Sequence, residues 1–483
     1  MKILIATSEA IPFIKTGGLA DVTGTLVDEL NGSGIRAAII LPFYRKIRQN
    51  AQNYNIRPLG IDIKIPLGSK TETAGLWKGE TPGGAPAYFI ENDKFYDRDD
   101  IYGTSGGDFP DNVYRFTFFN RAVCEAINTL GLTFDIIHCN DWQTGLIPVY
   151  IKTLYRDAFR KTATIITIHN LGFQGLFSSA DMPITGLGWE LFNSERLEFY
   201  GKINFLKGGI LFADLINTVS SNYAKEILTK DYGCGLDGVL KTRNRDIYGI
   251  INGINYKEWN PGEDRLIPAY YSRNDLSGKE QCKKTLLRTC GLPAGNALLI
   301  GLVTRFSSQK GLALVAEASA EIINSGINVI MLGKGDDSLQ NTFLSLGKKF
   351  SKQMSVTIGF DNVFAHKIYA GSDVFLMPSS YEPCGLGQLI ALRYGTIPVV
   401  RKTGGLVDTI KEYNSSEGSG TGFLFDRYSS DALISAIKRA QGFFRKKQHW
   451  LKIQKNAMSQ DFSWHKSAKQ YISLYKKTLT KIR

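Results

Sequence analysis

KILIATSEAIPFIKTGGLADVTGTLVDEL (residues 2–30) decides the fold at the start of the chain. Its apolar run ILIA is continuous rather than alternating, which is typical of a parallel strand that is covered on both faces. After Gly17 and Gly18, apolar residues recur at three- and four-residue steps, which predicts a helix with one apolar face: Leu19, Val22, Leu26, Val27 and Leu30. The stretch therefore predicts a buried strand, a glycine turn and a helix, as in an α/β fold.

The same pattern of apolar runs and helical segments continues along the chain. A second glycine turn, KTGGLVDT at 402–409, follows the run IPVV. The predicted strands fall into two series: 2–7, 36–41, 135–138, 163–168, 214–219 and 247–251, and then 298–303, 328–332, 354–358, 373–377 and 397–400. Two series of this kind predict two Rossmann-like domains that face a central cleft.

The length of 483 residues also favours more than one domain. NGINYKEWNPG at 252–262 mixes Gly, Asn and Pro, so we expect the hinge there. The predicted domains are 1–252 and 253–460. The last segment, 461–483, is predicted to be a helix that crosses back to the first domain.

Composition and charge narrow the classes of function. Hydrophobic residues make up 43% of the chain and charged residues 21%, as in a globular protein, and no apolar run has the length of a membrane span. Residues 438–483 contain 13 Lys or Arg and one acid, Asp461, and so account for +12 of the net charge of +13. We interpret this segment as a solvated helical surface, with a weak anionic contact as the alternative. We expect neither a nucleic-acid nor a membrane partner.

The N-terminus and the cysteines indicate a cytoplasmic protein. Met1 is followed directly by a predicted strand instead of a signal peptide. The six cysteines form no CxxC pair and have no zinc-ligand spacing, so we expect free thiols in a reducing compartment. DRDD at 97–100 contains a D-x-D pattern that holds a metal in some sugar transferases, but we interpret it as structural and expect no metal and no cofactor.

Polar and glycine residues gather just past the carboxyl ends of the predicted strands. Open parallel sheets bind ligands in the crevice outside these ends. For a lone histidine such as His169, a buried and satisfied side chain is the alternative interpretation. The candidate residues are Lys15, Gly17, Gly18, Asp141, His169, Asn170 and Asn252 in the first series, and Arg305, Lys310 and Glu382 in the second.

The two glycine turns share a possible function. The first N–H groups of a helix that follows such a turn form a natural anion site. Because Lys15 lies beside the first turn, we interpret residues 15–18 as a phosphate site. At 404–405 a phosphate site and a merely tight turn remain equal alternatives.

Two loops of the second series carry groups suited to a charged sugar donor. TRFSSQKG (304–311) places Arg305 and Lys310 where they could neutralise a diphosphate leaving group, although two basic residues on a surface loop are common. In SSYEPCGLGQ (379–388), Glu382 could accept hydrogen bonds from sugar hydroxyls or stabilise positive charge. The alternative is that Glu382 caps the helix that follows.

Taken together, the motifs resemble those of the bacterial glycogen synthases, within the glycogen/starch synthase family of two-Rossmann-domain (GT-B) glycosyltransferases. They occur in the expected order and cover most of the chain. The matching segments are KTGGLADV (15–22), NDWQTGL (140–146), TIHNLGFQG (167–175), NFLKGGI (204–210), INGI and WNP (251–261), SSQKG (307–311), AHKIYAGSD (365–373), EPCGLGQL (382–389) and YGTIPVVRKTGGLVDT (394–409).

The resemblance implies transfer of glucose from ADP-glucose to the non-reducing end of an α-1,4-glucan such as glycogen, with retained configuration. It implies that Lys15, the Gly17–Gly18 turn, Arg305 and Lys310 face the donor phosphates, and that Asp141 lies on the acceptor side or supports His169. Phe360 stands in GFDN where the family usually has Tyr, and would stack on the base. The residues implied around the glucose or the rest of the substrate are His169, Asn170, Asn252, Glu382, Cys384, Gly385, Leu386 and, in FYDR, Tyr96.

Other functions remain open at this stage. An enzyme of the same fold could use UDP-glucose, and a non-catalytic paralogue could bind glucan without transferring glucose. The presence of Lys15, His169, Arg305, Lys310 and Glu382 argues against the second alternative. The sequence leaves the oligomeric state undetermined.

Overall fold

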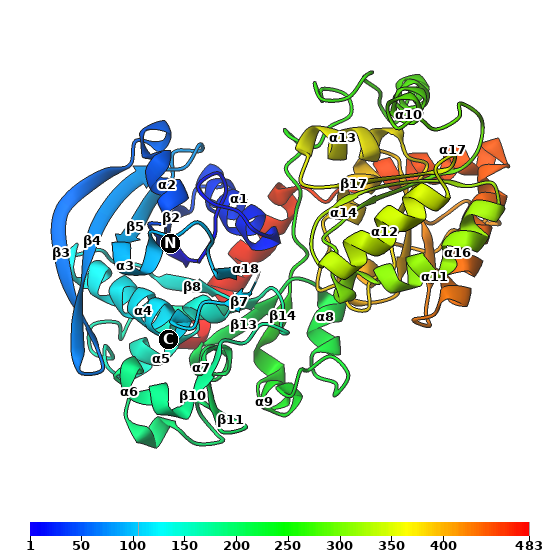
Figure 1. The fold of residues 1–483 in the computed structure, drawn as a ribbon. Coiled ribbons are helices and arrows are strands. Elements are labelled where there is room, and N and C mark those ends of the chain that lie inside the picture. The colour runs from blue at the N-terminus through cyan, green and yellow to red at the C-terminus, as the bar shows by residue number, and fades with distance from the viewer. Residues whose placement is uncertain (105, 483) are drawn as a thin grey trace. The chain divides into compact units, whose positions relative to one another are not determined.

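The computed structural model describes residues 1–104 and 106–482, which form two compact units (Figure 1). Unit 1 comprises Met1–Val219, Ala224–Ile250 and Trp464–Arg483, and unit 2 comprises Ser220–Tyr223 and Ile251–Ser463. Helix α8 (Ser221–Glu226) begins in unit 2 and ends in unit 1. Both units have the α/β architecture that the sequence predicts.

Unit 1 is built around a nine-stranded sheet with the order β14-β13-β9-β8-β1-β2-β5-β4-β3. Neighbours from β14 to β5 pair in parallel, and β4 and β3 extend the sheet as an antiparallel hairpin. The strands are β1 (Lys2–Ala6), β2 (Arg36–Pro42), β3 (Arg57–Leu67), β4 (Lys70–Glu80), β5 (Pro86–Glu91), β8 (Ile136–Asn140), β9 (Ala163–Ile168), β13 (Leu215–Thr218) and β14 (Ile247–Gly249).

The sequence analysis finds the buried parallel strands of unit 1 and misses the hairpin and β5. All six predicted strands of the first series are present, with ends that differ by at most two residues. The second half of β3, within GIDIKIPL (60–67), alternates exposed and buried residues because one face of the hairpin is exposed. A search for continuous apolar runs therefore passes over it. Small strands complete this part: β6 (Gly103–Thr104), β7 (Gly107–Asp108), β10 (Leu176–Ser178), β11 (Glu198–Phe199) and β12 (Lys202–Asn204).

Helices pack against the sheet of unit 1, and the last helix of the chain is one of them. Helix α18, red in Figure 1, contacts α1 and β9. The helices are α1 (Gly18–Gly32), α2 (Arg45–Gln49), α3 (Asp93–Tyr96), α4 (Asn112–Thr129), α5 (Leu146–Lys152), α6 (Met182–Thr185), α7 (Phe205–Phe212), α9 (Asp237–Thr242) and α18 (Trp464–Ile482).

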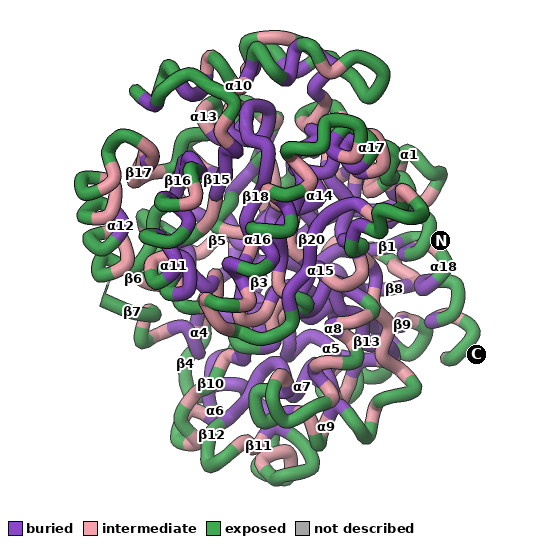
Figure 2. Tube along the Cα trace, turned by 90° about the vertical axis from the view of Figure 1, so that its right-hand side faces the viewer, coloured by how far each residue is buried: buried purple, intermediate pink, exposed green. Residues whose placement is uncertain are grey.

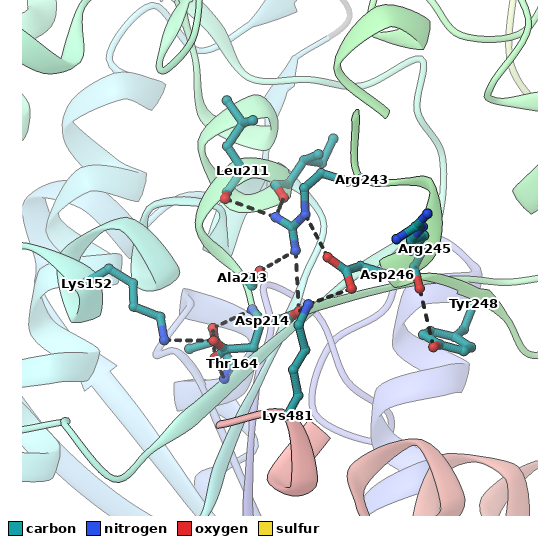
Figure 3. A network of polar contacts seen from close by, with 11 residues as sticks. Lys152, Thr164, Leu211, Ala213, Asp214, Arg243, Arg245, Asp246, Tyr248 and Lys481 are labelled. Atoms are coloured by element: carbon teal, nitrogen blue, oxygen red, sulfur yellow. Dashed lines mark hydrogen bonds and ion pairs between the residues drawn. The ribbon is translucent and has the colours of Figure 1, made fainter. Parts of the chain in front are cut away.

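An ionic network holds the end of α18 (Figure 3). Lys481 Nζ pairs with Asp246 Oδ1 at 2.5 Å and donates to the carbonyl of Asp214 at 2.9 Å. Arg243 Nε binds the same Asp246 at 3.1 Å. The carboxylate of Asp214 accepts the backbone N–H of Thr164 at 2.8 Å. The network therefore connects α18 to the amino ends of β9 and β13.

A second set of contacts attaches the middle of α18 to the buried sheet. The Tyr475 hydroxyl lies 2.9 Å from Nδ1 of His138, and Nε2 of His138 lies 2.6 Å from Oγ1 of Thr167. Asn217 donates to the Tyr471 hydroxyl at 3.2 Å. Burial lowers the pKa of His138 to about 3, so the ring is neutral and α18 completes a buried polar network.

Unit 2 contains a six-stranded parallel sheet with the order β17-β16-β15-β18-β19-β20. All five predicted strands of the second series are confirmed, and β20 is additional. The strands are β15 (Leu299–Val303), β16 (Asn328–Gly333), β17 (Met354–Ile358), β18 (Val374–Met377), β19 (Ile397–Arg401) and β20 (Phe423–Phe425).

Both faces of this sheet are covered, as its continuous apolar strands predict. Along β16, Val329 and Met331 enter one hydrophobic cluster, and Ile330 and Leu332 enter another. Figure 2 shows the central strands β15 and β18 buried beneath helices with exposed outer surfaces. The helices are α10 (Ser277–Thr289), α11 (Leu312–Asn324), α12 (Asp337–Lys349), α13 (Asn362–Gly371), α14 (Gly387–Arg393), α15 (Gly404–Thr409), α16 (Ser430–Phe444) and α17 (Lys447–Met458).

Two further features follow the sequence analysis. All six cysteines are free thiols, as predicted. Across residues 1–104 and 106–482, no helix combines the length and the apolar character needed to cross a membrane.

The attachment of α18 gives a testable prediction. Tyr475→Phe removes the hydroxyl that meets the buried His138 ring, and should lower the free energy of unfolding by about 1–2 kcal/mol. Urea unfolding followed by circular dichroism measures the change. Tyr270→Phe is the matched control, because Tyr270 is 57% exposed. Equal unfolding midpoints for Tyr475→Phe and the unmodified protein would contradict the role of this contact.

Candidate functional site

The carboxyl ends of β9, β8 and β1 lie side by side in unit 1 and are joined by the side chain of Asn140. Asn140 Nδ2 donates to the Ala6 carbonyl at 3.1 Å, and its Oδ1 lies 2.9 Å from Nε2 of His169. Because this oxygen can only accept, Nε2 of His169 carries the proton and Nδ1 carries the lone pair. The sequence analysis contains Asn140 only as the first residue of the NDWQTGL motif and does not select it as a candidate.

Asp141 and His169 are brought together, as their positions after adjacent strands predict. Asp141 has φ 56°, unusual for a residue other than glycine, and its Oδ1 accepts the His169 backbone N–H at 2.7 Å. Burial raises the pKa of Asp141 to about 7, although the N–H groups of His169 and Asn170 act in the opposite direction. Burial, with a smaller effect of His138, lowers the pKa of His169 to about 3, so His169 is neutral.

The first glycine turn is not the open phosphate site that the sequence predicts, because an acidic side chain of the same chain binds its N–H groups. The carboxylate of Glu9, 3% exposed, accepts the backbone N–H groups of Thr16 and Gly17. Lys15, whose side chain is about half exposed, pairs with Asp21 at 2.7 Å. Two N–H groups expected to face a phosphate are thus already engaged. The signal for Glu9 in the sequence is a single acid directly after a buried strand.

The position of Tyr96 also differs from the substrate contact that the family resemblance implies. Its side chain is 0% exposed, and its hydroxyl donates to the Arg115 carbonyl at 3.0 Å. Its ring packs against those of Tyr44 and Phe118. This position gives Tyr96 a packing role in the core instead of a contact with substrate.

In unit 2, the pairing of β15 with β18 brings Lys310 and Glu382 together. Lys310 Nζ lies 2.7 Å from Oε2 of Glu382, and Ser379 Oγ donates to the same oxygen at 2.9 Å. Glu382 is 5% exposed. Its carboxylate therefore binds a lysine and a serine of its own unit, which differs from the helix cap considered as the alternative.

The second glycine turn supports the backbone around Glu382. Gly405 donates its N–H to the Glu382 carbonyl at 3.0 Å. Gly404 has φ 46°, and a Cβ atom there would lie 1.8 Å from that carbonyl oxygen. At Gly405 a Cβ would lie 2.3 Å from the Cys384 carbonyl. This turn is therefore required for close approach of two backbone segments. That agrees with the interpretation of residues 404–405 as a tight turn instead of a phosphate site.

Cys384 and Asn252 lie together in unit 2, whereas the predicted boundary assigned Asn252 to the first domain. The Asn252 backbone N–H bonds to the Cys384 thiol. Burial raises the pKa of Cys384 to about 12, so it remains a thiol at neutral pH. The side-chain oxygen of Asn252 is buried and has no hydrogen-bond partner among the residues that the structure describes.

The remaining candidates of unit 2 also follow strand ends. Arg305, after β15, is exposed, and its guanidinium makes no hydrogen bond or ion pair with any described residue. Phe360, after β17, is 82% exposed, so its ring is free to stack on a ligand. Gly385 has φ 76° and is followed by Leu386, the residue that precedes α14.

The D-x-D pattern near residue 98 is held by an arginine. Arg45 Nε binds Asp97 and Arg45 Nη1 binds Asp99, both at 2.7 Å. The Arg45 guanidinium lowers the pKa of Asp97. Within the described part of the chain, no group of three or more His, Cys, Asp or Glu side chains is arranged to hold a metal ion.

Two α/β units with polar and cationic side chains at the carboxyl ends of parallel strands are typical of glycosyltransferases of the GT-B class. The starch synthase catalytic domain family matches residues 2–242, and glycosyl transferases group 1 matches residues 291–442. The chain belongs to the glycogen/starch synthase family.

Its relatives include proteins of nearly the same length. The glycogen synthase of Thermosipho africanus is 46% identical, and the match covers 100% of both chains. That of Thermodesulfovibrio yellowstonii is 45% identical over 99% of this chain and 97% of its own. Among solved structures, the catalytic domain of starch synthase IV from Arabidopsis thaliana, bound to ADP and acarbose, has a TM-score of 0.90 at 32% identity and covers 99% of each chain.

The glycine contact gives a prediction for activity. Gly404→Ala should displace the Glu382 carbonyl, and we expect a loss of at least about tenfold in glucosyl transfer together with a lower melting temperature. Gly442→Ala, in the interior of α16 with open space around it, is the control and should be neutral or slightly stabilising. Full activity of Gly404→Ala would show that the close approach is dispensable.

The raised pKa of Asp141 predicts a pH dependence of stability. The folded carboxyl binds a proton up to about pH 7 and the unfolded one only up to about pH 4. Its contribution to stability is therefore complete below about pH 4 and is lost as the pH rises through 7. Asp141→Asn stays uncharged and escapes this loss.

Urea unfolding of both proteins at a series of pH values tests this. The unfolding free energy of the unmodified protein should fall, relative to that of Asp141→Asn, as the pH rises through this range. Histidines common to both proteins cancel in the difference. A difference that does not change with pH would contradict the assigned pKa.

Proposed function

We propose that the protein transfers glucose from ADP-glucose to the non-reducing end of an α-1,4-glucan, with retention of configuration. The observation that carries the proposal is the Lys310–Glu382–Ser379 cluster at the ends of β15 and β18, in a chain 46% identical to a glycogen synthase over its whole length.

Lys310 and Arg305 are suited to the leaving diphosphate. Lys310 is a compact cation held in position by Glu382, and Arg305 is an unpaired guanidinium with respect to the described residues. As the bond from the anomeric carbon to the phosphate oxygen breaks, negative charge grows on the diphosphate and is stabilised by these cations. Lys15 would add a third cation by exchanging Asp21 for phosphate.

Retention is proposed to arise from attack on the same face that the leaving group departs from. The acceptor hydroxyl forms the new bond to the anomeric carbon, the diphosphate leaves with the bonding electrons, and the diphosphate takes the acceptor proton. Glu382 is already bound to Lys310 and Ser379, which favours positioning over covalent attack. The two-carboxylate logic of retaining glycosidases therefore does not transfer.

His169 and Asp141 are proposed to contact substrate from unit 1. A neutral His169, with Nε2–H on Asn140, offers the Nδ1 lone pair to a sugar hydroxyl. Asp141 holds the His169 backbone in place. Asn252, with a buried oxygen that lacks a partner among the described residues, is a natural acceptor for a further hydroxyl.

The preference for ADP-glucose over UDP-glucose is supported by the relative that binds ADP and acarbose. Transfer of labelled glucose from each donor into glycogen, with a chelator present, tests the proposal. We expect incorporation from ADP-glucose that survives the chelator and is lost in Glu382→Ala. Preferred use of UDP-glucose would overturn the donor assignment, and no incorporation from either donor would indicate a glucan-binding paralogue.

A second variant separates transfer from glucan binding. Lys310→Ala removes a cation from the leaving group and should lower turnover by about 10²–10³-fold, while glycogen binding changes little. Lys348→Ala, an exposed lysine on α12, is the control. Melting temperatures of both variants check folding, because Lys310→Ala leaves a buried carboxylate unpaired. Unchanged turnover would remove the phosphate role of Lys310.

A further inference from the structure

Unit 2 contains a cavity of about 920 Å³ that none of the proposed catalytic residues line. Leu298, Gly326 and Asp373 line it, and these residues lie at or just before the amino ends of β15, β16 and β18. The cavity is therefore at the opposite edge of the sheet from Arg305, Lys310 and Glu382. A volume of this size accommodates a small organic ligand.

The lining carries more positive than negative charge. Its cations are Lys279, Lys283, Lys284, Arg445 and Lys447, and its acids are Glu280 and Asp373. Asp373 is already neutralised, because its carboxylate binds Lys283 at 2.5 Å and accepts the Leu299 N–H at 2.8 Å. The side chains of Lys284, Arg445 and Lys447 are exposed and form no ion pair or hydrogen bond with a described residue. These three charges remain available to an anion.

The start of α17 makes an anion at this position more favourable still. Lys447 is the first residue of this 12-residue helix, Arg445 lies two residues before it, and no acid occurs in the first turn. No side chain caps the helix start. The positive end of a helix dipole favours negative charge, so these cations are unfavourable there without a counter-ion. A bound anion would relieve the repulsion.

The remaining wall is partly apolar, which suits a ligand larger than an inorganic ion. Phe444, Trp450 and Leu287 contribute apolar surface, and Ser277 and Asn296 contribute polar groups. The ring of Phe444 lies 4.9 Å from the Lys283 ammonium. A compact ring that carries a phosphate would match both the cations and this surface.

We propose that this cavity, lined by residues of α10, α16 and α17, binds a phosphate monoester of a compact polar molecule, of the sugar-phosphate class. Lys284, Arg445 and Lys447 bind the phosphate, and the wall formed by Phe444 and Trp450 contacts the ring. The site is separate from the donor site and independent of the proposed transfer reaction. It also accounts for part of the basic C-terminal charge, as the anionic contact that the sequence left as an alternative.

Isothermal titration of the full-length protein with ribose 5-phosphate, inorganic phosphate and ribose tests the proposal. Ribose 5-phosphate should bind more tightly than inorganic phosphate, ribose should not bind, and the affinity should fall with ionic strength. The double variant Arg445→Ala/Lys447→Ala should weaken binding at least about tenfold. Lys348→Ala/Lys349→Ala, on α12, is the charge-matched control and should bind normally.

Three results would overturn the proposal. These are the absence of binding at millimolar concentrations, binding that the double variant retains, and equal affinity for ribose 5-phosphate and inorganic phosphate. Lys310→Ala should still bind ribose 5-phosphate, and loss of binding in that variant would assign the signal to the donor site instead. Lys284→Gln provides a second, milder variant, and unchanged glucosyl transfer shows that the variants at Lys284, at Arg445 and Lys447, and at Lys348 and Lys349 are folded.

Discussion

The parallel pairing of β18 with β15 on one side and β19 on the other is the constraint on which the site of unit 2 depends. This pairing places three loops at one edge of the sheet, and each loop contributes different groups to the site. The loop after β15 provides the cations, and the loop after β18 provides Glu382. The loop after β19 provides glycines, which lack a Cβ atom and can therefore lie against the Glu382 carbonyl. Because Glu382 is held from both neighbours, its position is fixed by hydrogen bonds of the backbone as well as of the side chain.

Neutral groups dominate the corresponding edge of unit 1. Burial holds His138 and His169 in their uncharged forms and brings the pKa of Asp141 to about 7. The candidate cations therefore lie chiefly on unit 2, and unit 1 offers neutral hydrogen-bonding groups and the exposed Lys15. This division follows from desolvation, which penalises any buried group that carries charge without a partner.

The sequence analysis predicted the strands that are buried along their whole length. It missed the features that depend on contacts between residues far apart in the chain. Strands such as β9 and β16 were found because both their faces are buried. The hairpin β3–β4 was missed because only one of its faces is buried. Two nearly identical glycine turns look alike in sequence, yet one receives the carboxylate of Glu9 and the other lies against a neighbouring loop. Nothing in the local pattern distinguishes these partners. Tyr96 shows the same limit, because a motif gives its position in the chain and not the direction of its ring.

Because α18 follows unit 2 in the sequence but packs in unit 1, it affects the order in which the two units can finish folding. The first 250 residues contain every strand of the sheet of unit 1, but His138 and Asn217 also bind Tyr475 and Tyr471, more than two hundred residues later. Domains generally fold as they emerge during synthesis, the N-terminal one first. Here the order is reversed at the last step, since unit 2 is fully synthesised while unit 1 still lacks its final helix. Until α18 has been synthesised, the surface of unit 1 that α18 covers stays exposed, and a chain truncated before Trp464 lacks part of unit 1 although it contains all segments of unit 2.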